Sequence, residues 1–228
     1  MKKINFKEIM VYTIGLIVLG LGLTLSTKTN LGASALVAFP FAISSIYNLN
    51  LGIITLIYYI VFIIAQIIIH IIMKKYSNII NDIFQIVAAL ILSELLNILS
   101  SIIPVFNLIY LKVLFLFVAI IFVGVGISLM LKTKLPPNPP NGLIKTLVEF
   151  TKKDMGLIKN IVDITFVFIT GIFSYIVCKK IIGIGIGTII AMIGVGRVVY
   201  IFNKTLGKKI DNKINICYNT RRCEEKEE

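Results

Sequence analysis

Long apolar blocks with almost no charged residues constrain the fold of this chain more than any other feature. The stretches 52–69 and 113–131 are two examples. A helix that crosses a bilayer needs about 20 such residues. The 228-residue chain is 57% hydrophobic and 15% charged, whereas ordinary soluble domains average about 45–50% and about 25%. These figures exclude a soluble enzyme and a disordered protein, and they predict a single all-α membrane domain over 1–228.

The net charge of +12 arises from 23 Lys and Arg against 11 Asp and Glu. These basic residues lie in short clusters between the apolar blocks, as in the cytoplasmic loops of membrane proteins. We therefore expect the lipid bilayer, and no nucleic acid, as a partner. The polar segment 204–228 is predicted to be a cytoplasmic tail. Its Cys217 and Cys223 have no flanking histidines, so we expect free thiols and no metal site.

The apolar blocks predict six transmembrane helices, at about 9–27, 51–72, 83–103, 111–131, 156–177 and 183–202. The uncharged segment 31–49 is a candidate seventh span, although it contains Gly32 and Pro40. With six spans and the N-terminus inside, the inner side holds 17 Lys and Arg against 4 outside. With seven spans and the N-terminus outside, the counts are 15 and 6. Both arrangements satisfy the positive-inside rule, and the first, with both termini cytoplasmic, satisfies it better.

An internal repeat relates the two halves of the chain. With a shift of 104 residues, 20–70 aligns with 124–174 without gaps and with 12 identities in 51 pairs. The clearest match places LGLGLTLSTKTNL (19–31) over VGVGISLMLKTKL (123–135). Phe62 likewise aligns with Phe166. The two repeats are expected to cover about 9–103 and 111–203.

The repeat bears on whether 31–49 crosses the membrane. Its counterpart, 135–155, contains Lys145, Glu149, Lys152, Lys153 and Asp154. Charged residues at a helix centre cost about 2.5–3.5 kcal/mol each on the insertion scale, so 135–155 cannot span and 31–49 is expected to behave alike. Each half then has three spans, with a broken or re-entrant segment after its first helix. An odd number of spans inverts the second half, and a 3+3 inverted repeat is a common plan of secondary transporters.

Glycines at equivalent positions of the halves are expected to allow close helix packing. Gly183, Gly185 and Gly187 superficially resemble a dinucleotide loop, but Thr188 stands where the third glycine belongs. We therefore assign a structural role to Gly20, Gly22, Gly52, Gly124, Gly126, Gly156, Gly185 and Gly187.

The two broken segments are candidates for lining a solute path. The second reads LPPNPPNG over 135–142, and prolines lack the N–H donor that a helix interior needs. Non-helical backbone at membrane depth is tolerated only where it is buried in protein or lines a water-filled cavity. The candidates are Pro40, Phe41, Asn138, Asn141 and Gly142. The alternative is a stiff connector that lies in the interface.

Polar residues inside spans are the other candidates, because each needs a partner or water. Lys159 and Asp163 lie one turn apart, and Arg197 is predicted at a similar depth. This cluster would bind an anionic solute, or it is a structural ion network near the cytoplasmic interface.

Glu94 lies near the middle of its predicted span, with Asn97 one turn away and Gln85 further along the helix. Glu94 is predicted either to face the solute path and exchange a proton, or to tie two helices together. His70 is expected at the membrane interface.

Several motifs resemble those of the YczE/YitT-like bacterial membrane proteins. They are LGAS (31–34), FPFAIS (39–44), PNPPNGL (137–143), MGLIKNIVD (155–163) and GIGIGTII (183–190). The resemblance covers about 10–203 and implies a multi-pass protein of the bacterial cytoplasmic membrane. It implies no defined activity. The chain departs from the pattern at Ala35-Leu36-Val37 and at Pro139-Pro140-Asn141-Gly142, where relatives often carry an acidic residue.

The sequence thus predicts a transporter (secondary permease) for an unknown small molecule or ion. The alternatives are a non-transporting scaffold or accessory subunit, and a substrate-binding subunit of a larger uptake complex. No catalytic constellation appears, so we expect no enzyme and no cofactor. A homodimer is a further expectation.

Overall fold

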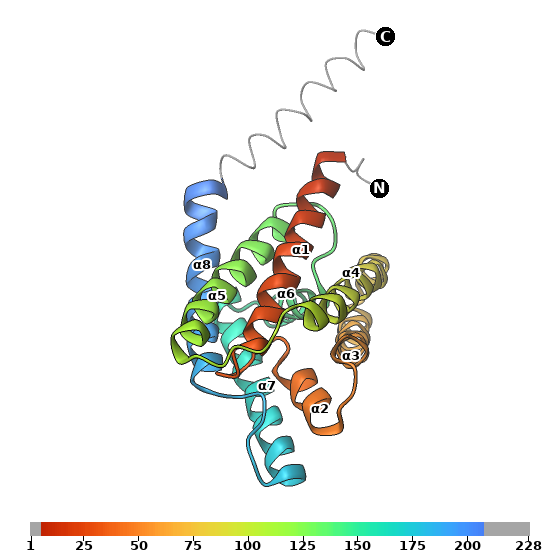
Figure 1. The fold of residues 1–228 in the computed structure, drawn as a ribbon. Helices are drawn as coiled ribbons and strands as arrows, with labels where there is room; N and C mark the ends of the chain where they lie inside the picture. Colours follow the sequence, from red (N-terminus) through yellow and green to blue (C-terminus); the bar gives the residue numbers. More distant parts are fainter. Residues whose placement is uncertain (1–5, 208–228) are drawn as a thin grey trace.

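The computed structural model describes residues 6–207, and within that range it is helical, without β-strands (Figure 1). Its elements are α1 (Phe6–Lys28), α2 (Ala38–Tyr47), α3 (Leu51–Ile72), α4 (Tyr76–Ile102), α5 (Ile109–Leu131), α6 (Pro139–Thr151), α7 (Met155–Cys178), α8 (Ile186–Phe202) and a short π-helical turn (Asn203–Gly207). Six of them, α1, α3, α4, α5, α7 and α8, are long and apolar enough to cross a membrane. This agrees with the predicted number of spans and is the pattern of a multi-pass membrane protein.

Three predicted helix starts differ from the structure by three or more residues. One of them is that of α1, which begins at Phe6 and not at residue 9. The helix expected at 83–103 begins at Tyr76, because Asn78 and Asp82 continue its inward face with polar side chains that a search for apolar residues misses. The helix expected at 183–202 begins only at Ile186. Gly183 has a φ of +84°, a left-handed conformation that favours glycine and ends regular structure before α8.

The two segments that were expected to be broken form short helices. Residues 31–37 are not helical, and α2 after them has 10 residues. The proline-rich segment does not simply interrupt a helix, because Pro139 and Pro140 occupy the first turn of the 13-residue α6. Proline is well tolerated there, since the first helical N–H groups have no intrahelical acceptor. The expectation that 31–49 is not a full span is consistent with these lengths.

Helices α1 and α5 cross in close contact at the centre of the molecule (Figure 1). A Cβ added to Gly22 would lie 2.7 Å from the Val123 backbone nitrogen. A Cβ added to Gly126 would lie 2.7 Å from the Leu19 backbone nitrogen. Neither position has room for a side chain, so these glycines set the distance between the helices.

Helices α4 and α8 flank this crossing in the same manner. Gly20 of α1 faces Leu92 and Leu95 of α4, and Gly124 of α5 faces Val195 and Val198 of α8. The order of packing is therefore α4, α1, α5, α8.

The remaining glycines differ in role. The Gly52 amide donates to Asn97 Oδ1 (2.9 Å), and its Cα faces the Ser93 carbonyl too closely for a side chain. Gly156 lies at the exposed start of α7, where an added Cβ would meet only the Asp154 carboxylate. The close helix packing expected at Gly156 was therefore wrong. Cys217, Cys223 and most of the predicted tail lie outside the described residues.

We predict that the α1–α5 crossing is intolerant of any added methyl group. Gly22→Ala and Gly126→Ala should each lower the free energy of unfolding by about 1–3 kcal/mol, because the added atom overlaps backbone. Gly196→Ala is the matched control, since nothing lies within 4 Å of its added Cβ. The measurement is thermal unfolding of purified protein in detergent. An equal effect at Gly196 would contradict the packing argument.

Candidate functional site

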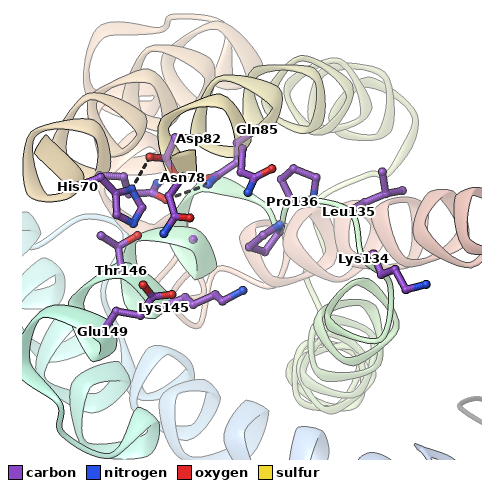
Figure 2. A pocket seen from close by; sticks show the side chains of 14 residues that line it. His70, Asn78, Asp82, Gln85, Lys134, Leu135, Pro136, Lys145, Thr146 and Glu149 are labelled. Carbon is purple, nitrogen blue, oxygen red and sulfur yellow. Dashed lines mark hydrogen bonds and ion pairs between the residues drawn. The ribbon is translucent and has the colours of Figure 1, made fainter. Parts of the chain in front are cut away.

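A polar cavity of about 130 Å³ lies between α3, α4, α6 and the segment 134–137 (Figure 2). Water occupies about 30 Å³ per molecule in the liquid, so this volume holds about four waters or one small solute. Its lining is predominantly polar, although α3 and α4, the two long helices that border it, are apolar. Its walls are formed by Gln66, His70, Asn78, Asn81, Asp82, Gln85, Lys134, Leu135, Pro136, Pro137, Gly142, Lys145, Thr146 and Glu149.

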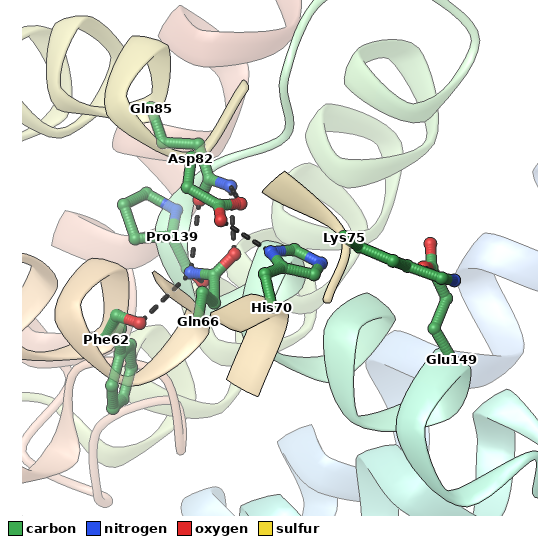
Figure 3. Close-up of polar contacts among 8 residues, drawn as sticks. All are labelled: Phe62, Gln66, His70, Lys75, Asp82, Gln85, Pro139 and Glu149. Carbon is green, nitrogen blue, oxygen red and sulfur yellow. Dashed lines mark hydrogen bonds and ion pairs between the residues drawn. The ribbon is translucent and has the colours of Figure 1, made fainter. Parts of the chain in front are cut away.

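One wall is a buried, hydrogen-bonded His–Asp pair between neighbouring helices. His70 Nδ1 of α3 lies 2.6 Å from Asp82 Oδ2 of α4 (Figure 3). The two residues are only 4% and 3% exposed. A buried carboxylate needs a partner to offset its lost hydration, and the short α3–α4 connection supplies one.

A pair of glutamine amides continues this wall. Gln85 Nε2 donates to Gln66 Oε1 (2.9 Å), and Gln66 Nε2 donates in return to Gln85 Oε1 (3.3 Å). Gln85 Nε2 also lies 3.4 Å from Asp82 Oδ1. The His–Asp pair and the amide pair therefore form one hydrogen-bonded network, which we call the polar network (Gln66, His70, Asp82 and Gln85).

The start of α6 closes the cavity from the second half of the chain. Gln66 Nε2 donates to the Pro139 carbonyl (3.1 Å). A Cβ added to Gly142 would lie 2.5 Å from Gln85 Oε1 and 2.6 Å from Gln66 Oε1. Because glycine has no Cβ, Gly142 allows α6 to approach the amide pair this closely.

Two buried asparagines lie in the same turn. Asn141 Nδ2 donates to Asn138 Oδ1 (2.5 Å), whereas Asn138 Nδ2 has no acceptor within the described chain. Pro139 and Pro140 contribute no N–H, so this helix start offers fewer backbone donors to an anion than most helix N-termini do.

Charges of both signs surround the cavity. Glu149 Oε2 pairs with Lys75 Nζ (2.9 Å), and Lys134 Nζ lies 3.4 Å from Glu8 Oε1. Lys145 is exposed at the rim. The site therefore offers amide, imidazole, carboxylate and ammonium groups, which suit a small polar solute with both donors and acceptors. Within residues 6–207, no group of three or more His, Cys, Asp and Glu is arranged to hold a metal ion.

The structure brings together some of the predicted site residues. Gln85 and Gly142 line the cavity, with Asn138 and Asn141 buried in the α6 turn behind it. Pro40 is buried and Phe41 partly buried in α2, outside the cavity lining.

The structure does not bring Glu94 to the cavity, although it was predicted either to face a solute path or to tie two helices together. Glu94 is exposed on the outer face of α4, and the polar cavity does not include it. The reason is the orientation of Glu94 around the axis of α4. The inward face of this helix carries Gln85, Leu92 and Leu96, and Glu94 lies on the opposite side. Asn97 instead accepts from the Gly52 amide at the start of α3.

The predicted cluster of Lys159, Asp163 and Arg197 forms only in part. Lys159 Nζ pairs with Asp163 Oδ2 on one face of α7, and Asp163 is 3% exposed. Arg197 is exposed on α8 and makes no ion pair within the described chain. Lys159 therefore neutralises Asp163, and the surplus positive charge faces outward.

Sequence reasoning missed Gln66, His70 and Asp82 as site residues. His70, near the end of α3, is buried in the polar network. A usable signal existed, because Gln66 and His70 are four residues apart in an otherwise apolar helix and Asp82 and Gln85 are three apart. Such spacings put polar side chains on one helix face.

Comparison with known families gives one result. A model described as a "Family of unknown function (DUF6198)" matches residues 6–204. No curated protein and no solved structure matches the chain. The match covers most of the chain, but its description does not name the YczE/YitT-like proteins. The similarity to those proteins therefore remains a resemblance.

We predict that the two glutamines act as a unit. Gln66→Leu or Gln85→Leu alone should cost about 1–3 kcal/mol, because each leaves the buried amide oxygen of the other glutamine without its donor. The double variant should cost clearly less than the sum of the two, since both amides are then removed. Thermal unfolding of the four proteins measures this coupling. Strict additivity would mean that the amide pair does not form.

Proposed function

The chain belongs to this family of unknown function, and we propose that it is a secondary permease for a small polar solute in the bacterial cytoplasmic membrane. The observation that carries the proposal is the polar cavity, which is partly open and lies between apolar helices of membrane-spanning length. Polar and ionisable groups among such helices are costly and commonly mark solute pathways. The polar network is the proposed solute site.

Reciprocal contacts support an inverted repeat. Gly22 faces Val123 and Ala119, and in the aligned positions Gly126 faces Leu19 and Gly15. Phe62 and Phe166, which align with each other, are in contact with ring centroids 4.9 Å apart. Equivalent residues touch in this way when a two-fold axis passes between them. On this proposal, α2 and α6 are the re-entrant segments of the two halves, and such segments commonly border the binding sites of transporters.

The region equivalent to the cavity is tightly packed in the other half. There the segment 31–33 lies directly on the start of α8. The Ala33 amide donates to the Gly183 carbonyl (2.9 Å), and the Gly187 amide donates to the Leu31 carbonyl (2.8 Å). A Cβ added to Gly185 would lie 2.2 Å from the Leu31 carbonyl oxygen.

This difference between the halves is what a transporter open to one side requires. In the proposed orientation, the cavity opens to the cytoplasm, since Lys75, Lys134 and Lys145 lie at its edge and basic residues gather on that side. The packed region, next to Lys179 and Lys180, is then the closed outer gate. Transport would exchange the packed and open arrangements between the halves.

Asn78 and Asn160 provide a matched pair for testing the site. Asn78 lines the cavity, and its side chain makes no hydrogen bond to another described residue, whereas Asn160 is exposed on α7. We predict that Asn78→Ala weakens solute binding by about tenfold, the loss of about one good hydrogen bond, while Asn160→Ala has no effect. A thermal-shift screen of small polar solutes, including zwitterions, identifies a ligand, and its Kd is then measured for the three proteins.

Uptake of that ligand into liposomes that contain only this protein separates the functional classes. A permease takes it up, and a substrate-binding subunit binds it without uptake. A scaffold gives no ligand in the screen. Either of the last two outcomes would overturn the proposal.

We further predict that Gly185→Ala loosens the outer gate, because its added methyl group cannot coexist with the Leu31 carbonyl at the present distance. The measurement uses Ser174→Cys, a buried position behind the gate, in a chain whose three native cysteines are replaced by serine. A membrane-impermeant maleimide applied from outside should label it several-fold faster when Gly185→Ala is present. Gly196→Ala is the control, and equal labelling rates in all variants would contradict the gate.

A further inference from the structure

Two charged side chains face outward from the interior of apolar spans. Glu94 of α4 lies eight residues before Ile102, and Arg197 of α8 lies eight residues before Thr205, each the last residue of its span. At 1.5 Å per residue, both are about 12 Å inside. Both are exposed, and neither makes an ion pair or hydrogen bond within residues 6–207. Facing lipid, each would be an unpaired charge in hydrocarbon, which is costly.

The contacts of α4 and α8 make these two positions equivalent. Gly20 faces Leu92 and Leu95, and its counterpart Gly124 faces Val195 and Val198. The offset is 103 in both pairs, and the same offset relates Glu94 to Arg197. The two halves therefore carry opposite charges at the same place on their third long helix.

Each charge lies within an exposed apolar face. On α4 the surrounding exposed residues are Val87, Leu90, Ile91 and Ile98, and on α8 they are Ile189, Ile190, Ile193, Tyr200 and Ile201. The two helices lie at opposite ends of the α4–α1–α5–α8 row, so Glu94 and Arg197 are too far apart to pair within one copy (Figure 1). Their charges can be matched only by another molecule.

We propose that this molecule is a second copy of the chain, in which α4 of each copy packs against α8 of the other and Glu94 pairs with Arg197 of the partner subunit. In a two-fold dimer whose axis lies along the membrane normal, the α4–α1–α5–α8 row of one copy lies antiparallel beside the same row of the other, so contact of α4 with the partner's α8 implies the reciprocal contact. Both charges of both copies are thereby neutralised. In a hydrocarbon core about 30 Å thick, positions about 12 Å from opposite faces differ in level by about 6 Å, which an extended arginine side chain spans.

Such a dimer requires both helices to face the bilayer and does not require transport. It also gives Glu94 a partner that the single chain lacks. The apolar residues around each charge would supply the packed surface of the same interface.

Charge reversal tests the pairing. The wild-type protein should be a dimer in mild detergent by light scattering coupled to size exclusion. Glu94→Arg and Arg197→Glu should each raise the dimer dissociation constant by more than about tenfold, because like charges then meet in a buried contact. The double variant Glu94→Arg/Arg197→Glu should restore the dimer. Lys180→Glu, at an exposed loop between α7 and α8, is the control and should not change it.

Cysteine cross-linking covers the case in which a reversal variant fails to fold. Two differently tagged copies, one with Glu94→Cys and the other with Arg197→Cys and both lacking native cysteines, are co-expressed. They should form a disulfide-linked product that carries both tags, and neither copy should cross-link to itself. A monomeric wild-type protein, reversal variants that dimerise like the wild type, or the absence of the mixed product would each overturn the proposal.

Discussion

The glycine-lined crossing of α1 and α5 is the interaction on which the rest of the structure depends. Helices in a bilayer gain little from hydrophobic burial against each other, so close backbone approach and packing must hold them together. Gly22 and Gly126 allow that approach, and Gly20 and Gly124 extend it to α4 and α8. Because α1 and α5 each begin one half of the chain, their crossing fixes how the halves meet. The positions of α6 against α3, and of the segment 31–33 against α8, follow from it.

Structural features that depend on local composition or on the repeat could be predicted from the sequence. The sequence did not predict which side of a helix a given side chain occupies. Six apolar blocks became six long helices, and five of the six paired glycines lie at close contacts, because apolar length and repeated small residues can be read without knowing the partner. Glu94 shows the opposite case: its position along α4 was correct, but a single polar residue carries no information about which face is inward. His70 and Asp82 pair across a helix hairpin, which residue spacing within one helix does not reveal.

The proline-rich segment shows that the rule that proline ends a helix can be correct and still miss the helix that begins at the same residues. Prolines do end helical hydrogen bonding on their N-terminal side, yet Pro139 and Pro140 also suit the first turn of a new helix. The result is a helix start that is poor in N–H donors and carries a carbonyl, at Pro139, that accepts from Gln66. Gly142 then brings this turn against the glutamine pair. The cavity therefore combines a hairpin from the first half with a helix start from the second.

The two halves differ most where the proposed solute site lies, and side-chain size gives a physical reason. By the 104-residue shift, Gln66 and His70 correspond to Thr170 and Ser174, and by the offset of the third helices Gln85 corresponds to Thr188. The long side chains of the first half hold a hydrogen-bonded wall beside open space. In the second half the Thr170 and Ser174 hydroxyls donate to nearby backbone carbonyls, Ser174 to that of Ile182 (3.1 Å), and Thr188 accepts from the Gly185 amide. These short side chains leave room for the segment 31–33 to pack directly on α8. A solute that binds the glutamine and histidine side would thus find no equivalent amide or imidazole groups on the other side. If the protein transports as proposed, it binds the solute more strongly on the side of the polar network than on the opposite side. Alternation between the two arrangements then requires the backbone contacts of Leu31 and Ala33 to break, and no equivalent polar network replaces them.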